Sequence, residues 1–223
     1  MIPWEEIDRA EIPGSDEEVT LRRRGSEFSI RTKETELMNS RLHGSEEALA
    51  ELTCKRDGKS NLKILIGGLG MGFTLAAAIK KSDPETHITV SELIPAVVKW
   101  NIDHLGHLAG NPLNNPRVNL KTEDVAKTIG QKESVWDVIL LDVDNGPEGL
   151  TRKANDQLYN KSGLKTLFFA LCPQGILGIW SAKEDNAFTQ RLKQSGFMVQ
   201  TKSISARKSK KNKRHTIWIA KKP

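Results

Sequence analysis

A glycine-rich turn directly after a short apolar segment constrains this chain more than any other feature. The segment LKILI (residues 62–66) has the composition of a buried strand, and GGLGMG (67–72) follows it without a break. Glycines in such a turn let the backbone approach a ligand closely and leave the first N–H groups of the next helix unpaired. The candidates for binding a nucleotide-like group are therefore the four glycines of this turn: Gly67, Gly68, Gly70 and Gly72.

The order of elements after residue 60 predicts an α/β domain. Short apolar runs alternate with amphipathic stretches, as in βα units on a mostly parallel sheet. The last two runs, 197–205 and 214–221, are joined by a basic loop with no room for a crossover helix, so they must pair antiparallel. The other predicted strands are 62–66, 87–92, 117–121, 136–142 and 175–181, and the main predicted helices are 73–81, 95–106, 155–171 and 184–194.

The first 60 residues have a different pattern. Residues 18–40 alternate polar and apolar side chains around Gly25-Ser26, which predicts a hairpin. Residues 45–58 predict a helix with Ser45 as N-cap. A chain of 223 residues fits one α/β core with a small appendage. We therefore divide it into a hairpin-and-helix extension (1–60) and a main domain (61–223).

Acidic residues follow the second and third predicted strands. Glu92 ends the second strand twenty positions after Gly72, where a carboxylate can accept both ribose hydroxyls of an adenosyl group. Asp124 follows the third strand and has two compatible interpretations. It can accept the amino group of an adenine while Val125 offers its backbone N–H, or it can cap the short helix 125–130.

Two further acids lie at the end of the most apolar strand, 136–142. Asp142 and Asp144 occupy the carboxyl edge of the sheet, where open α/β sheets bind ligands. Carboxylates there can hold an amine nucleophile and accept its proton, which makes both residues catalytic candidates. The alternative is a simple turn, because Asp-Asn-Gly-Pro (144–147) has strong turn chemistry.

Several of these segments together resemble a known family. IGGLGMG, VSEL, Glu123-Asp124, WDVILLDVDNGP and Leu158-Tyr159 resemble the spermidine synthase family of aminopropyltransferases, over residues 36–180. The resemblance implies a Rossmann-like class I methyltransferase fold with a mostly parallel seven-stranded sheet and a C-terminal antiparallel hairpin. It also implies a homodimer and a cofactor that is S-adenosylmethionine or its decarboxylated form.

The resemblance assigns roles to residues already singled out. The four glycines would bind the cofactor, Glu92 the ribose and Asp124 the adenine, and Asp142 would accept a proton. Tyr159 would line the pocket of a small-molecule acceptor, although packing of its helix explains it equally well.

The departures from the family pattern concern substrate recognition. A GGGDGG-type loop is replaced by GGLGMG, so its acid is missing, and a DSSDP segment is replaced by DVDNGP. The family's tyrosine and glutamine before a helical glutamate are replaced by Ser45 and Glu46 beside Glu47. These changes favour methyl transfer to a small-molecule or amine acceptor, with a polyamine aminopropyltransferase as the alternative.

A noncatalytic module that binds an adenosyl group or nucleic acid is a second alternative. The net charge is +6, and much of it lies in the loop 207–214, which is either a solvated hairpin loop or a contact for a polyanion. The terminal hairpin argues against a nicotinamide-dependent oxidoreductase, which also uses a glycine loop and a following acid.

Other classes of protein and site are not expected. No apolar run has the length of a membrane span and the acidic start does not resemble a signal peptide, so we expect a cytoplasmic protein. The cysteines and histidines have no metal-ligand spacing, so we expect no metal site.

Overall fold

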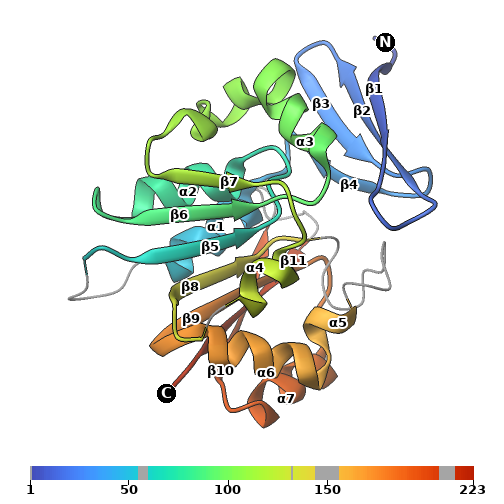
Figure 1. Ribbon diagram of the computed structural model, residues 1–223. Coiled ribbons are helices and arrows are strands. Elements are labelled where there is room, and N and C mark those ends of the chain that lie inside the picture. The colour runs from blue at the N-terminus through green and yellow to red at the C-terminus, as the bar shows by residue number, and fades with distance from the viewer. Residues whose placement is uncertain (1, 55–59, 132, 144–155, 206–213) are drawn as a thin grey trace.

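The computed structural model describes residues 2–54, 60–131, 133–143, 156–205 and 214–223. Within these residues a seven-stranded sheet of order β10-β11-β9-β8-β5-β6-β7 forms the centre of the molecule (Figure 1). The five neighbouring strands β9, β8, β5, β6 and β7 pair in parallel. At the β9 edge, β11 pairs antiparallel with β9, and β10 pairs antiparallel with β11. The predicted sheet and terminal hairpin are therefore confirmed. The strands are β5 (Lys63–Gly67), β6 (His87–Ser91), β7 (Val118–Lys121), β8 (Trp136–Leu141), β9 (Leu171–Ser181), β10 (Met198–Ser205) and β11 (Arg214–Lys221).

Helices cover both faces of this sheet because the central strands are apolar on both sides. Ile64 and Ile66 point into one core cluster, whereas Leu65 points into the other. Helices α1 (Gly44–Thr53), α2 (Phe73–Lys81) and α3 (Pro95–Trp100) contribute to the first cluster. Helices α4 (Val125–Gly130), α5 (Asp156–Tyr159), α6 (Lys161–Ala170) and α7 (Asn186–Gln194) contribute to the second.

Two predicted helices are interrupted. The helix expected at 95–106 is α-helical only to Trp100 and continues as a π-turn (Asn101–Leu105) and a 3-10 turn (Gly106–Ala109). The side chain of Asn101 donates to the backbone oxygens of Val97 and Gly70, which ties this widened turn to the glycine loop. The helix expected at 155–171 is divided at Asn160, whose side chain accepts from the Gly163 N–H and caps α6.

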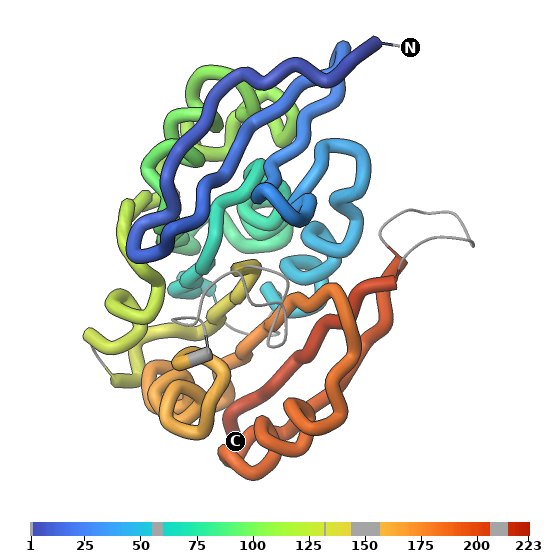
Figure 2. The backbone as a smooth tube through the Cα atoms, turned by 90° about the vertical axis from the view of Figure 1, so that its right-hand side faces the viewer, coloured from blue at the N-terminus to red at the C-terminus, as the bar shows by residue number. Residues whose placement is uncertain are grey.

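A second, antiparallel sheet of order β1-β2-β3-β4 is formed by the N-terminal residues. Its strands are β1 (Glu5–Glu11), β2 (Glu18–Arg24), β3 (Glu27–Arg31) and β4 (Glu36–Asn39). The predicted hairpin at Gly25-Ser26 is present as β2–β3, but the sheet is larger than expected because β1 and β4 flank that hairpin. This sheet lies at the top of Figure 1, whereas β10 and the C-terminus lie at the bottom, and in Figure 2 it likewise lies above the β10–β11 hairpin.

Helix α1 begins differently from the sequence prediction. His43 is its N-cap residue and Ser45 lies inside the first turn, so the prediction that Ser45 caps the helix is wrong. The Ser45 hydroxyl instead donates to the Glu46 carboxylate (2.5 Å) and contacts His215 Nδ1 (2.8 Å). The helix ends at Thr53 rather than near Gly58, which lies outside the described residues. No helix in the described part of the chain combines the length and apolar character needed to span a membrane.

Candidate active site

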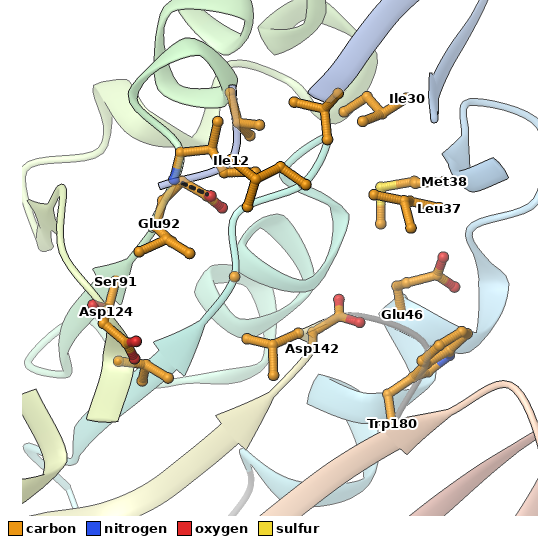
Figure 3. Close-up of a pocket in the computed structure, with 18 residues that line it drawn as sticks. Ile12, Ile30, Leu37, Met38, Glu46, Ser91, Glu92, Asp124, Asp142 and Trp180 are labelled. Carbon is orange, nitrogen blue, oxygen red and sulfur yellow. Dashed lines mark hydrogen bonds between the residues drawn. The ribbon is translucent and has the colours of Figure 1, made fainter. Parts of the chain in front are cut away.

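A cavity lies between the carboxyl ends of the parallel strands and the N-terminal sheet (Figure 3). The large sheet and its loops contribute the backbone of Gly68 and Gly70, the acids Glu92, Asp124 and Asp142, and aliphatic side chains. The aliphatic residues are Leu93, Ile94, Val97, Val125 and Val143. The N-terminal sheet and its turns contribute an apolar wall of Ile12, Val19, Ile30, Leu37 and Met38. Helix α1 adds Glu46, and the end of β9 adds Trp180.

The glycine loop approaches its neighbours too closely for larger side chains. Gly68 has a φ of +89°, and a Cβ atom there would lie 2.4 Å from the backbone oxygen of Asp142. Gly70 has a φ of +51°, and a Cβ atom there would lie 2.9 Å from the sulfur of Met38. Both glycines line the cavity, so the loop presents backbone rather than side chains to a ligand.

The other two predicted glycines shape the loop from outside the cavity. A Cβ atom at Gly67 would lie 2.9 Å from the side chain of Val125, so a glycine lets β5 end against α4. Gly72 is the N-cap of α2, with a left-handed backbone. The structure therefore divides the four glycines into two that line the cavity and two that position the loop.

Glu92 is held at one end of the cavity by the backbone. Its carboxylate oxygens accept from the N–H groups of Leu69 (2.8 Å) and Ile94 (2.9 Å). Its burial raises the pKa of the carboxyl, although these backbone hydrogen bonds act in the opposite direction. The N–H groups of Gly70 and Leu93 also favour its charged form, so the backbone on both sides fixes this carboxylate in the cavity.

Asp124 and Val125 lie beyond Glu92 in the same cavity. Asp124 caps α4, because its side chain accepts from the Ala126 N–H (2.9 Å). The capping interpretation is therefore confirmed, while contact with an adenine stays a prediction.

A pair of acids, Glu46 and Asp142, faces the cavity at its other end (Figure 3). The Thr74 hydroxyl donates to Asp142 (2.6 Å), and Ser45 donates to Glu46. Burial raises the pKa of Asp142 to about 6. Burial, with the nearby charge of Asp142, raises the pKa of Glu46 to about 7. The charge of Asp142 thus opposes the ionisation of Glu46.

Trp180 forms the wall beside these acids (Figure 3). Its side chain packs edge-on against His215, with ring centroids 4.7 Å apart. The residue is 6% exposed, and its indole N–H has no acceptor among the described residues. Trp180 is therefore both a buried residue and part of the cavity wall.

Of the other two predicted catalytic candidates, Tyr159 does not line this cavity and Asp144 is not among the described residues. Tyr159 packs edge-on against Phe188 (centroids 5.6 Å apart) in the core under α6 and α7, and it is not among the cavity-lining residues. Helix packing therefore accounts for it, and its assignment to an acceptor pocket has no support from its position. Asp144 lies outside the described residues.

The basic loop 207–214 also lies outside the described residues, apart from Arg214. Arg214 donates to the side chain and backbone of Ser203 on the paired strand. Contact with nucleic acid and a homodimer both stay predictions.

Sequence interpretation missed the apolar wall and Glu46 as parts of the site. The alternation in β2 and β3 indicated a buried face, but no local pattern tells that this face covers the glycine loop. Glu46 was visible only as a departure from the family pattern, and the fold brings it to Asp142, 96 positions later in the chain.

Comparison with known proteins agrees with this arrangement. The family model for the spermine/spermidine synthase domain matches residues 43–205. No curated protein matches the sequence. The fold matches spermidine synthase from Thermotoga maritima with a TM-score of 0.75 and 14% identity, covering 98% of this chain and 72% of that one. A spermidine synthase in complex with the transition state analogue AdoDATO gives the same values.

A probable spermidine synthase from Corynebacterium glutamicum ATCC 13032 matches with a TM-score of 0.66 and 15% identity, covering 96% of this chain and 79% of that one. At these identities the solved structures establish the fold alone. The family match covers well over half of the chain, from α1 to β10. The chain therefore belongs to the spermine/spermidine synthase family of transferases.

Proposed function

We propose that this protein is an aminopropyltransferase that uses decarboxylated S-adenosylmethionine and a small amine acceptor. One observation carries the proposal: a single cavity of a spermidine synthase-type fold holds Glu92 at one end and the partly buried Asp142 at the other. The binding of AdoDATO by a spermidine synthase of the same fold supports it. The methyl transfer that we favoured from the sequence lacks such support, and the aminopropyl alternative is the better one.

The residues present fit an adenosyl cofactor. Glu92, which the N–H groups of Leu69 and Ile94 hold in the cavity, would accept the ribose hydroxyls. Gly68 and Gly70 would lie against the ligand with no side chain between, and Asp124 with Val125 would border the base. When bound, the cofactor supplies an electrophilic carbon next to a sulfonium.

The chain's own contribution is to position the amine and take its proton. Asp142 lies at the end of β8 beside the glycine loop, and Thr74 fixes one of its oxygens. A carboxylate whose pKa is raised toward the working pH is a better proton acceptor than an ordinary one. The apolar wall from the N-terminal sheet excludes water, which favours a displacement that depends on positioning and desolvation.

The proposal is tested by turnover with decarboxylated S-adenosylmethionine and a panel of 1,3-diaminopropane, putrescine and cadaverine. Asp142→Asn should lower kcat at least about 100-fold, the usual contribution of a positioned proton acceptor, and leave cofactor binding intact. Asp103→Asn is the matched control, since Asp103 pairs with Lys99 on the surface. Unchanged turnover in Asp142→Asn would rule out the assigned role.

Methyl transfer is the second candidate because the loop lacks an acid. The sulfur of Met38 occupies the space into which a side chain at position 70 would project. Calorimetry with S-adenosylmethionine and with its decarboxylated form separates the two candidates. Preference for the intact cofactor supports methyl transfer, and preference for the decarboxylated form supports aminopropyl transfer. Glu92→Ala should weaken the binding of either.

A further inference from the structure

We infer that Glu46 is the specificity-determining residue for an alkylammonium group at the Trp180 end of the cavity. The inference rests on the proposed function and extends it, because it assigns substrate selection to helix α1. It also names the chemistry selected: a chain that ends in a cation and carries no carboxylate there.

The first support is that two carboxylates share this end and the described residues supply no counter-ion to them. Their side-chain hydrogen-bond partners, Ser45 and Thr74, are neutral hydroxyls. Neither Glu46 nor Asp142 takes part in an ion pair with any described residue. Glu46 is 4% exposed, and burying an unpaired charge is unfavourable. A cation that enters the cavity would therefore be stabilised by both acids.

The second support is the neighbouring tryptophan. Trp180 is more than nine-tenths buried, and its N–H has no acceptor within the described part of the chain. The N–H is itself inaccessible, so it is the aromatic ring of Trp180 that lines the cavity at this end. Tryptophan is also the aromatic side chain that attracts cations most strongly.

The third support is that the glycine loop cannot select for charge. Gly70 has no side chain, and Met38 fills the space in front of it. Asp142 is committed to the reacting amine under the proposed function. Glu46 is then the acid at this end that is left to distinguish a cationic chain from a neutral or anionic one. Beside two acids, the carboxylate of intact S-adenosylmethionine would be repelled.

The test compares decarboxylated S-adenosylmethionine with 5′-methylthioadenosine, which has the same adenosyl group and no ammonium. Calorimetry gives both affinities for the wild-type protein and for Glu46→Gln, which keeps the shape of the side chain. We expect Glu46→Gln to weaken the charged ligand about tenfold or more, as for loss of a charged hydrogen bond, with 5′-methylthioadenosine unchanged. Glu47→Gln is the matched control, since its half-exposed side chain pairs with His43.

A second arm identifies the source of the ammonium group. Putrescine is titrated into the free protein and into protein saturated with 5′-methylthioadenosine, again for wild type, Glu46→Gln and Glu47→Gln. If Glu46→Gln loses affinity only for decarboxylated S-adenosylmethionine, the site binds the ammonium of the aminopropyl chain. If it loses affinity only for putrescine, the site binds the ammonium of the acceptor. Either result supports the inference.

Equal affinities in wild type and Glu46→Gln for both cations overturn the inference, as does failure of the wild type to bind either cation. Failure of the proposed function looks different: 5′-methylthioadenosine would not bind, or its binding would survive Glu92→Ala. In that case the putrescine titration of the free protein still decides the role of Glu46.

Discussion

At the scale of single residues, Glu46 and Asp142 make the free protein's stability depend on pH. Burial raises their pKa values from the ordinary 4.5 and 3.8 to about 7 and about 6. The folded chain therefore holds protons that the unfolded chain has lost. Stability is highest below the unfolded-state pKa values and falls as the pH rises through those of the folded state.

Glu46→Gln should remove part of this dependence. The side chains that act on Glu46 are Asp142, Ser45 and Glu47, and only Glu46 is changed. We expect a Tm at pH 8 above that of the wild type by about 2–4 °C for each kcal/mol recovered, with little difference at pH 4. Thermal melts between pH 4 and pH 8 measure this difference, with Asp103→Asn on the surface as control. Parallel curves for the wild type and Glu46→Gln would contradict the assigned ionisation.

Gly68 is the residue at which a single methyl group should disturb the site most. Alanine there combines a φ of +89° with a contact of 2.4 Å to the Asp142 backbone. We expect Gly68→Ala to cost about 1–3 kcal/mol in the free energy of unfolding, measured in urea, and to weaken nucleoside binding. Gly130→Ala is the control: a methyl group added there would have no atom within 4 Å, and alanine favours a helix. Equal unfolding curves for the two variants would contradict this account of the loop.

Which site residues the sequence could predict depended on the range of their contacts. The glycines and Glu92 were predictable because strand, turn and following acid lie close together in the chain. Ser45 was assigned to a local cap, but its hydroxyl contacts His215, 170 positions away. Glu46 and Trp180 meet Asp142 only through the packing of α1 and β9 on the sheet, which no local pattern contains.

At the scale of elements, β1 shows why an edge strand escapes sequence interpretation. Its sequence, EEIDRAE, places charged residues on both faces, and five of its seven residues are exposed. It has no buried apolar face to produce an alternating pattern. A polar contact attaches β1 to α3 instead: the indole N–H of Trp100 donates to the Asp8 carboxylate (2.7 Å). This hydrogen bond is the main cause of the lowered pKa of Asp8.

Asp8→Ala should therefore loosen β1 without disturbing the large sheet. The substitution leaves the N–H of the buried Trp100 without its acceptor, which costs about 1–3 kcal/mol. Hydrogen–deuterium exchange should show faster exchange in β1 and β2 and unchanged exchange in β5 and β8. Asp16→Ala, at an exposed position between β1 and β2, should behave as wild type. Uniformly faster exchange would mean that the bond serves the whole fold rather than this attachment.

At the scale of the whole molecule, the cavity lies between the two sheets and is lined by residues of both. The large sheet, predicted from the order of its elements, supplies the glycine backbone and three of the acids, together with aliphatic residues from its loops. The N-terminal sheet supplies the apolar wall, and Met38 from β4 accepts a contact from the Met71 N–H in the glycine loop (3.2 Å to sulfur). A ligand in this cavity touches both sheets, so its binding free energy should stabilise them together.

A ligand without an ammonium group tests whether binding stabilises the two sheets together, because its affinity does not depend on the charges of Glu46 and Asp142. 5′-Methylthioadenosine at 100 times its Kd should add about 2.7 kcal/mol to the free energy of unfolding. For a chain of this size that corresponds to a rise in Tm of about 5–10 °C. Exchange should slow in β2–β4 as well as at the ends of β5 and β6, and Glu92→Ala should abolish both effects. Slower exchange confined to the large sheet would mean that the N-terminal sheet only borders the cavity, and its apolar wall would then have no part in holding the ligand.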